Sequence, residues 1–435
     1  MSSTTITETS NLKRLNDAVL LPGDILLTTS TEKFSKGIRR VTKSDISHAM
    51  IYVDDRSIID ATGEGVHARN TQRLFYEEDC PVYALRLRDN LNATSLQKIL
   101  TYMRGHIGAQ YSYKEAALTA LGGAHSFSKK QFCSRLVAQA FESAGILLVG
   151  DSNYCSPEDI KSSPLLIEVS DSTVPATHEE LLWNQESVDI TKLMRESTNT
   201  ILTGARDKDP TIQTFDDMDN YLVANPECDD EFCQLLNTSG YLTIWKTELD
   251  KNPWQYNIYF MNEMPPDVIE EYCWSVLKSE KSGPHRYISN RMGYNFLFRQ
   301  HNLKFFRIMM ELFEHLASLH QQRIRVATSW LEINGHLTES KASILEPHTP
   351  EWFAALEQWD LHQAKQTREI INLAGSSDVC SICGDDTAND HVLIKSQRPP
   401  GGPGTLRLCD DCLKIRGLMG EQYLPLNDQQ DENIH

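Results

Sequence analysis

The sequence predicts an α+β protein in three parts: a mixed N-terminal domain, a mainly helical middle region and a small cysteine-rich module. Three observations support this prediction. Residues 20–90 alternate between apolar and polar side chains as strands do, residues 265–333 contain amphipathic helices, and two C-x-x-C pairs lie between residues 380 and 412. A length of 435 residues is too great for one ordinary core and favours two or three domains.

The changes in composition along the chain suggest where these parts begin and end. The predicted segments are a disordered lead-in (1–17), a mixed domain (18–175), a mainly helical region of unknown fold (176–372), a cysteine module (373–420) and a tail (421–435).

The N-terminal strands are placed by their turns and their alternation. The stretch "LPGDILLTTS" opens with a Pro-Gly turn and continues as an apolar strand. In "SHAMIYVDD", Ala49, Ile51 and Val53 share one face, and His48, Met50 and Tyr52 share the other. We expect further strands in "RSIIDATGEGVHA" and in "CPVYALRLR".

Helices are expected on both sides of a short loop. Residues 93–105 have a helical pattern, and "GAQYSY" follows them as a loop. A second helix begins near Cys133, because apolar residues recur at helical spacing up to Gly145, a natural C-cap. Beyond residue 175 we expect mostly helices, in "THEELLWNQESVDITKLMRES", "PPDVIEEYCWSVLKSEK" and the amphipathic run from residue 302 to 333.

Charge and hydropathy exclude some classes of function. The net charge is -18. Residues 1–170 are neutral, with 19 Lys+Arg and 19 Asp+Glu, so the remainder holds the whole acidic excess. Nucleic-acid binders usually present a basic face, so this composition does not favour nucleic acid as a partner. The sequence contains no run of about eighteen apolar residues, so it predicts no transmembrane segment.

The N-terminus and the cysteines suggest a compartment. The first residues, "MSSTTITETS", are polar and lack the apolar region of a secretory signal. We therefore expect a cytoplasmic protein whose ten cysteines stay reduced. An effector exported without such a signal is the alternative.

Cys133 is the candidate nucleophile. In "KKQFCSRLVAQAFESAG" it stands in the first turn of the expected helix, where unpaired N–H groups and the positive end of the helix dipole favour a thiolate. Lys129 and Lys130 would add to this effect if they lie near. A nucleophilic cysteine also needs a base within hydrogen-bond reach and a third group that orients the base.

His48 is the candidate base and Asp60 the candidate orienting group. If Asp54 to Arg56 form the hairpin loop, Val53 pairs with Ser57, Met50 pairs with Asp60, and His48 lies diagonal to Asp60 on one face. A two-residue loop at Asp54–Asp55 would instead put the two side chains on opposite faces. Glu64 and His67 are fallback third members.

Each residue of this set also has a structural explanation. A single cysteine at a helix start is more often a small buried hydrophobe. A histidine that alternates with apolar residues is more often a hydrogen-bonded core residue, and an aspartate in a strand can simply accept a backbone amide. Spacing alone leaves the catalytic and the structural explanations about equal.

Five segments in order resemble a known family: "PGDILL", "SHAMIYVDD…SIIDATGEGV", "GAQYSY", "FCSRLVAQAFESAG" and "SPEDIKSSP". They look like the permuted branch of the NlpC-type papain-like superfamily, which includes YiiX-type hydrolases and the lecithin retinol acyltransferase group. The resemblance spans roughly residues 18–170. It implies a circularly permuted papain-like fold in which the order is His, polar residue, Cys, as in His48, Asp60 and Cys133.

The resemblance also implies roles for these residues. Cys133 would be the nucleophile, His48 the general base and then acid, and Asp60 the residue that holds the imidazole. The Cys133 N–H would be one oxyanion donor, and Gln131 is the candidate we consider for the second. Members of this superfamily act as amidases, peptidases, acyltransferases and thioesterases, so the resemblance does not specify the acyl acceptor.

The C-terminal module predicts a structural zinc site. Cys380 and Cys383 form one C-x-x-C pair, Cys409 and Cys412 form the other, and 25 residues separate the two pairs. Two such pairs in a reducing compartment favour one closed tetrahedral Zn²⁺ site, whose binding energy folds a module too small for its own core. The frame resembles the treble-clef zinc module of the ClpX chaperone, which implies that it binds protein.

The sequence as a whole therefore predicts a cysteine peptidase or amidase. We expect it to cleave an amide, isopeptide or thioester bond in a protein or peptide-like substrate, with the zinc module recruiting a partner or the substrate. Two alternatives remain. One is an acyltransferase or thioesterase that acts on lipid, and the other is a non-catalytic adaptor with a papain-like scaffold.

Overall fold

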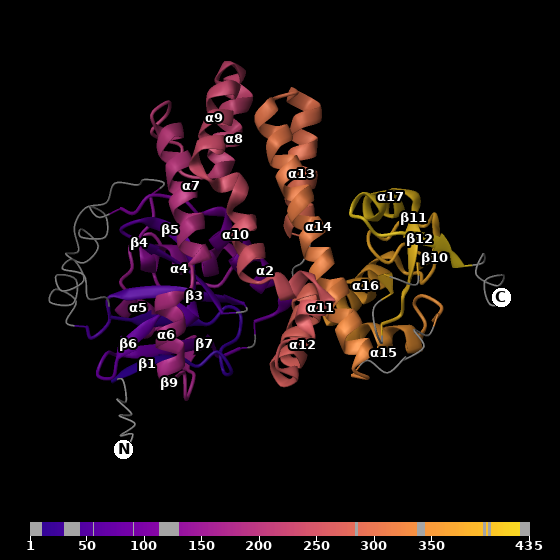
Figure 1. The fold of residues 1–435 in the computed structure, drawn as a ribbon. Helices are drawn as coiled ribbons and strands as arrows, with labels where there is room; N and C mark the ends of the chain where they lie inside the picture. Colours follow the sequence, from indigo (N-terminus) through magenta and orange to yellow (C-terminus); the bar gives the residue numbers. More distant parts are fainter. Residues whose placement is uncertain are drawn as a thin grey trace. The chain divides into compact units, whose positions relative to one another are not determined.

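The computed structural model describes residues 11–29, 44–54, 56–89, 91–112, 130–282, 286–336, 344–394, 397–398 and 402–426. The chain forms two compact units (Figure 1). The first comprises Met1–Lys251 with His301–Phe305, and the second comprises Asn252–Gln300 with Phe306–His435.

The first unit is built on a six-stranded antiparallel sheet in the order β5-β4-β3-β2-β7-β8. Its strands are β2 (Ile25–Thr28), β3 (His48–Asp54), β4 (Ser57–Thr62), β5 (Gly65–Asn70), β7 (Val82–Leu87) and β8 (Leu166–Glu168). A three-stranded sheet, β6-β1-β9, comprises β1 (Leu12–Leu15), β6 (Phe75–Glu77) and β9 (Thr173–Pro175). The strands predicted around residues 25, 50 and 84 are confirmed.

The two faces of the large sheet are covered by different layers. Apolar side chains on one face pack against α2 (Ala93–Gly105) and α4 (Cys133–Ser143). On the other face, Met50 and Tyr52 of β3 pack with Leu15 of β1. The alternation in "SHAMIYVDD" therefore separates two cores, as period-two patterning requires.

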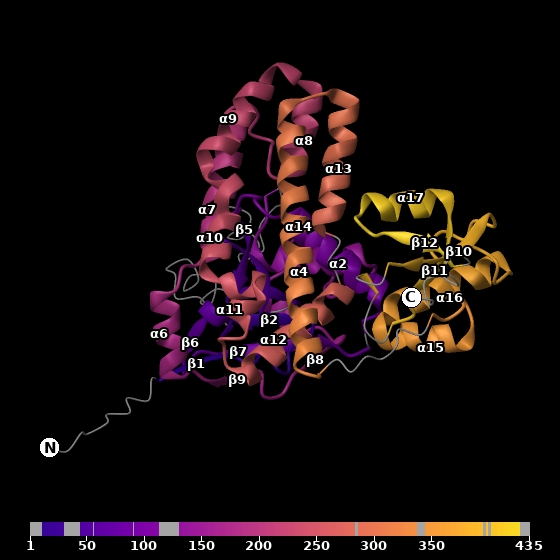
Figure 2. The ribbon, with the colours of Figure 1, turned by 45° about the vertical axis from the view of Figure 1, so that its right-hand side comes forward.

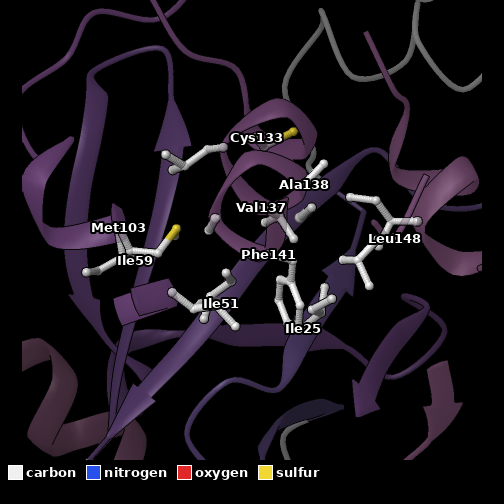
Figure 3. Packing of buried hydrophobic residues seen from close by; sticks show 14 of the residues in the cluster. Ile25, Ile51, Ile59, Met103, Cys133, Val137, Ala138, Phe141 and Leu148 are labelled. Atoms are coloured by element: carbon white, nitrogen blue, oxygen red, sulfur yellow. The ribbon is translucent and has the colours of Figure 1, made fainter. Parts of the chain in front are cut away.

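The helix that begins at Cys133 is anchored by its apolar face. Figure 3 shows Val137 and Phe141 of α4 among the core residues of the sheet, with Ile25 and Ile51 close to the Phe141 ring. Phe141 is only 1% exposed. This packing fixes the axis of α4 and, with it, the position of Cys133 at its first turn.

Replacing Phe141 by alanine should therefore lower the free energy of unfolding of the first unit by about 3–5 kcal/mol, because it leaves a cavity in a close-packed core. Urea denaturation of the full chain measures this loss. Leu147→Ala is the matched control, since Leu147 is 64% exposed, and should change the value by less than about 0.5 kcal/mol. Equal effects of the two substitutions would contradict this packing.

The first unit continues beyond the predicted boundary at residue 175. Before that boundary it also contains α5 (Pro157–Lys161) and the short 3₁₀ turn η1 (Thr71–Arg73). After it come α6 (His178–Glu186), α7 (Ile190–Arg206), α8 (Phe215–Ala224), α9 (Asp229–Ser239) and α10 (Ile244–Lys251), with the 3₁₀ turns η2 (Pro226–Cys228) and η3 (Tyr241–Thr243). Helix α7 lies against β5: Asn199 donates to the Glu64 carbonyl at 3.0 Å, and Arg206 donates to the Gly108 carbonyl at 2.8 Å.

The lead-in predicted to be disordered over residues 1–17 differs from the structure at its end. Residues 12–15 form β1, which pairs with β6 on one side and β9 on the other. Leu15 is buried, and Arg14 forms an ion pair with Glu180 at 2.6 Å. A segment of four residues is too short for alternation to predict a strand. This strand therefore forms because it pairs with β6 and β9. Residues 1–10 lie outside the described part.

The second unit begins with helices and ends with the cysteine module. Its helices are η4 (Pro253–Tyr256), α11 (Ile258–Met261), α12 (Pro266–Ser282), α13 (Arg286–His301), α14 (Lys304–Ile333), α15 (Pro350–Trp359), α16 (Leu361–Ala374) and α17 (Asp410–Leu418). A small sheet in the order β11-β10-β12 comprises β10 (Ala388–Leu393), β11 (Thr405–Cys409) and β12 (Tyr423–Pro425). The amphipathic helices predicted near residues 266 and 304 are confirmed.

Helices α13 and α14 lie side by side in both ribbon views (Figures 1 and 2). The Tyr294 ring of α13 stacks on Phe313 of α14, with ring centroids 5.7 Å apart. In the opposite part of α14, Ala327 and Leu331 pack with Cys273 of α12. None of the helices in the described part of the chain combines the length and apolarity needed to cross a bilayer.

Candidate active site and metal centre

Cys133 occupies the first position of α4. The N-cap residue, Phe132, supplies no side-chain acceptor for the amide groups of the first turn. Cys133 is buried, and its Sγ lies 4.0 Å from the Ser47 carbonyl, directly before β3. The thiol therefore lies where the positive end of a helix meets the start of the strand that carries His48.

The segment before Cys133 is held by a neighbouring loop. Gln131 donates its backbone N–H to the Gln110 carbonyl at 2.9 Å and accepts from the Ser112 N–H at 2.8 Å. That loop is in turn fastened to β5, where Val66 donates to the Ala109 carbonyl. A Cβ at Gly65, whose φ is +97°, would lie 2.8 Å from the Ala109 oxygen, so the glycine makes this close approach possible.

A buried arginine fixes the chain on both sides of α4. Arg135 donates from Nη1 to the Lys130 carbonyl at 2.9 Å and from Nε to the Asn153 carbonyl at 2.8 Å. Its guanidinium also lies 4.5 Å from the centre of the Phe132 ring. Lys130 contributes a backbone acceptor here, and Lys129 lies outside the described residues.

The hairpin that carries His48 and Asp60 has the register needed to join them. Met50 pairs with Asp60, as predicted, so His48 and Asp60 are diagonal neighbours on one face. The predicted Val53–Ser57 pair is wrong: Asp54 pairs with Ser57, and the register shifts between Tyr52 and Asp54. The loop between the two strands is therefore shorter than predicted, and by itself it would place His48 and Asp60 on opposite faces of the sheet. A bulge at Val53 adds one unpaired residue to β3, which returns the two side chains to the same face.

His48 bridges the carboxylate and the thiol. Its Nε2 lies 2.6 Å from Asp60 Oδ2, and its side chain is also within hydrogen-bond reach of Cys133. With Nε2–H donating to the carboxylate, Nδ1 is the ring nitrogen left for the sulfur. The structure thus brings together all three residues of the predicted set.

The charges of these groups support one another. Burial by itself lowers the pKa of His48, but the hydrogen bond to Asp60 and the adjacent Cys133 outweigh it and raise that pKa to about 9. Burial also favours the neutral form of Asp60, yet Arg69 and His48 hold the pKa of this carboxyl well below its usual range. An imidazolium between a carboxylate and a sulfur is the expected state at neutral pH.

The N-terminal part of the chain matches a known family. Residues 19–198 match the family described as "Permuted papain-like amidase enzyme, YaeF/YiiX, C92 family". The resemblance seen in the sequence is confirmed. The circularly permuted papain-like domain, the helical region and the cysteine cluster together are the predicted fold class.

Two relatives illustrate the match. The protein named "Probable lipoprotein peptidase YaeF" of Escherichia coli K12 is 26% identical, and the match covers 34% of this chain and 66% of that protein, slightly under two thirds of its length. The crystal structure of the metalloprotein YiiX from Escherichia coli O157:H7 is 19% identical, with a TM-score of 0.29, and is covered over 97% of its length by 35% of this chain.

In the permuted papain-like domain, Asp60 has a charged neighbour, Arg69, that the sequence analysis did not identify. Arg69 of β5 donates from Nη2 to Asp60 Oδ2, the oxygen that also binds His48. Alternation could have revealed it, because Arg69 is two residues after His67, which pairs with Asp60 across the sheet. The prediction of a single strand from residue 56 to 68 hid the turn between Thr62 and Gly65 that creates this neighbour.

The fallback third members lie in different places. His67 is buried, with Nε2 3.9 Å from Asp60 Oδ1. Glu64 is exposed and pairs with Arg195 of α7 at 3.3 Å. Gln131 donates one N–H of its side-chain amide to Gln139 Oε1 at 3.2 Å, and its role as the second oxyanion donor stays a prediction.

The four cysteines of the C-terminal module form one cluster. The sulfurs of Cys380, Cys383, Cys409 and Cys412 all lie within 4.8 Å of one another. The first pair lies in a tight turn closed by the Gly384 N–H on the Cys380 carbonyl at 3.1 Å, and the second pair opens α17. Four convergent sulfur donors fit a metal ion that prefers tetrahedral thiolate coordination.

Backbone amides are aimed at the first of these sulfurs. Burial would raise the pKa of Cys380, but the amide groups of Cys409, Cys383 and Ile382 outweigh burial and lower it. N–H groups directed at a cysteine sulfur stabilise the thiolate form that binds metal. The turn is thus built to present a thiolate.

The cysteine cluster shares its core with the two helices before it. Trp352 and Phe353 of α15 and Ala364 of α16 pack with Cys380 and Cys409. The Trp352 indole N–H donates to the Thr405 carbonyl at 2.9 Å. The predicted boundary at residue 373 therefore passes through a set of side chains that pack together.

Proposed function

We propose that this protein is a cysteine hydrolase that cleaves an amide, isopeptide or thioester bond, with Cys133 as the nucleophile, His48 as the acid and base, and Asp60 as the group that orients His48. The observation that carries this proposal is the 2.6 Å contact of His48 with Asp60, made while His48 also lies within reach of Cys133. The family match describes amidases and supports the reaction class.

The proposed reaction has two steps. The Cys133 sulfur attacks the acyl carbon, the imidazolium of His48 gives its proton to the leaving group, and a thioester forms. Neutral His48 then takes a proton from water, which attacks the thioester and releases the acid and the Cys133 thiolate. The Cys133 N–H, at the start of α4, would stabilise the oxyanion in both steps.

We assign a protein or peptide-like substrate, since the matched family consists of amidases and the curated relative is named a peptidase. A lipid-directed acyltransferase or thioesterase would use the same first step. A non-catalytic adaptor would not need His48 to contact both Asp60 and Cys133 in a buried site, so the geometry favours an enzyme.

For the second unit we propose a structural Zn²⁺ ion on Cys380, Cys383, Cys409 and Cys412, in a module that binds a protein partner or recruits the substrate. The sulfur-only donor set and the two C-x-x-C pairs support zinc. We also propose a reducing, cytoplasmic setting, which the ten free cysteines support, although the relative YaeF is named a lipoprotein peptidase.

The proposed nucleophile can be tested without knowing the substrate. Iodoacetamide should label Cys133 of the full chain ahead of Cys155, Cys233 and Cys273, because burial raises the pKa of those three thiols. Mass mapping of the modified site measures the rate at each cysteine.

The pH dependence has a defined direction. Because the pKa of His48 is raised to about 9, its imidazolium is present from acidic pH and is lost only as the pH rises through about 9. Labelling of Cys133 should therefore stay fast at pH 6, where free thiols react slowly. In His48→Ala this fast reaction at pH 6 should fall by about tenfold or more. Slow labelling of all cysteines, unchanged by the substitution, would refute the proposed function.

A further inference from the structure

The two oxygens of Asp60 have different surroundings. Oδ2 accepts hydrogen bonds from His48 on one side and from Arg69 on the other. Oδ1 is buried and has no hydrogen-bond partner among the described residues. The orientation of the carboxylate therefore depends on the two cations that share Oδ2.

His67 is the other cation candidate near Asp60, but its tautomer prevents a bond. Its Nδ1 lies 3.0 Å from the Gly65 carbonyl, which can only accept, so Nδ1 carries the proton. In neutral His67, Nε2 then carries a lone pair and no proton, so it cannot donate a hydrogen bond to Asp60 Oδ1, which lies 3.9 Å away. Burial lowers the pKa of His67, which keeps the ring neutral. Arg69 is thus the permanent positive charge that contacts Asp60.

Arg69 is itself well placed to hold one position. It lies on β5, two residues after His67, and its Nη2 also contacts the Met50 sulfur at 3.4 Å. Met50 pairs with Asp60 across β3 and β4. The guanidinium of Arg69 therefore contacts both of the strands that carry His48 and Asp60, β3 through Met50 and β4 through Asp60.

We propose that Arg69 is a positioning residue that keeps Asp60 ionised and turned toward His48, an inference that rests on the proposed function of Cys133 and His48. Without Arg69, Asp60 is a buried carboxylate balanced only by His48, and burial favours its neutral form. A protonated Asp60 no longer stabilises the imidazolium. The reactive state of Cys133 should then be lost at a higher pH than in the wild type.

Other titratable groups also face this network. They are Cys133 from α4, Tyr76 from β6, Cys80 beyond it, Glu64 from the turn between β4 and β5, and Arg195 from α7. Burial raises the pKa of Tyr76, so it stays neutral in the range of the test. Glu64 and Arg195 pair with each other, so the cations that contact Asp60 directly are His48 and Arg69.

The test measures the rate of iodoacetamide labelling of Cys133 against pH for the wild type, Arg69→Gln and Arg69→Lys. In Arg69→Gln we expect the acidic limb of the profile to move up by about one pH unit, the shift that one close opposite charge typically produces. On that limb the rate should fall about tenfold at a given pH. Arg69→Lys keeps the charge without the planar fork and should restore most of the limb.

Arg86→Gln is the matched control. Arg86 forms an ion pair with the buried Asp24 at 2.7 Å in the same sheet, without contact to His48. It should affect stability and leave the profile unmoved. A profile of Arg69→Gln that is only scaled down, with its limb where the wild type has it, would overturn the proposal, and so would equal behaviour of the lysine and glutamine variants. Failure of the proposed function looks different, because the wild type itself would then show no fast labelling at Cys133.

Discussion

Replacing Cys133 by alanine should reduce turnover of peptide amides or aryl thioesters by about 10⁴-fold or more, the loss seen when a nucleophile is removed from a preorganised site. The reason is chemical: no other described group lies both at the start of α4 and beside His48. The measurement is the initial rate on a panel of fluorogenic peptide amides and aryl thioesters, which also separates the candidate bond types.

Two further variants make this prediction specific. Asp60→Asn keeps the shape of the side chain but removes the charge that stabilises the His48 imidazolium, so we expect a loss of about 10²–10⁴-fold in kcat. Cys80→Ala is the control, since Cys80 lies in the turn after β6, where its sulfur contacts the carbonyls of Thr29 and Pro81 among the described residues. A Cys133→Ala protein as active as the Cys80→Ala protein would rule out a thioester intermediate at Cys133.

The arrangement of the site could be predicted as far as side-chain alternation determines it. Alternation placed His48 and Met50 on one face, and the Met50–Asp60 pair is present. The loop could not be predicted, since its turn residue, Arg56, has a φ of +59° without being glycine. The Arg56 N–H donates to the Tyr52 hydroxyl at 3.2 Å. No local sequence pattern predicts this contact.

Parts of the fold that depend on distant partners were also missed. Strand β1 is four residues long and is defined by pairing with β6 and β9, which lie more than sixty residues away in the chain. Arg69 became a neighbour of Asp60 only through the turn between Thr62 and Gly65. Both features come from tertiary contacts, which outweigh the weak local preferences of short strands.

Local patterns also explain why the four clustered cysteines of the C-terminal module were predicted, whereas its predicted start at residue 373 was too late in the chain. The C-x-x-C spacing identifies Cys380 and Cys409 as members of one cluster, because each pair can close only a tight turn. It contains no information on which helices cover the cluster. Trp352 of α15 supplies that cover from 28 residues before Cys380, so the folding unit of the module extends back to α15.

Removing the metal should therefore unfold more than the predicted module. The full chain is expected to purify with about one zinc ion, and chelation should remove a binding free energy of about 10–16 kcal/mol that folds such modules. Hydrogen exchange with mass spectrometry should then show loss of protection in α15, α16, β10 and β11, because these elements share one core with the cysteines. Strands β2, β3 and β4 of the first unit should keep their protection.

Cys409→Ser and Cys273→Ser form the matched pair for this prediction. Both residues are buried cysteines of the second unit, but Cys273 packs with Met261 and Leu331, away from the cluster. Cys409→Ser should lose the zinc measured by mass spectrometry and the protection of α15, whereas Cys273→Ser should keep both. If the metal-free chain keeps the protection of α15, then the apolar core around Trp352 is sufficient by itself and the sulfur cluster adds recognition or redox chemistry instead of folding energy.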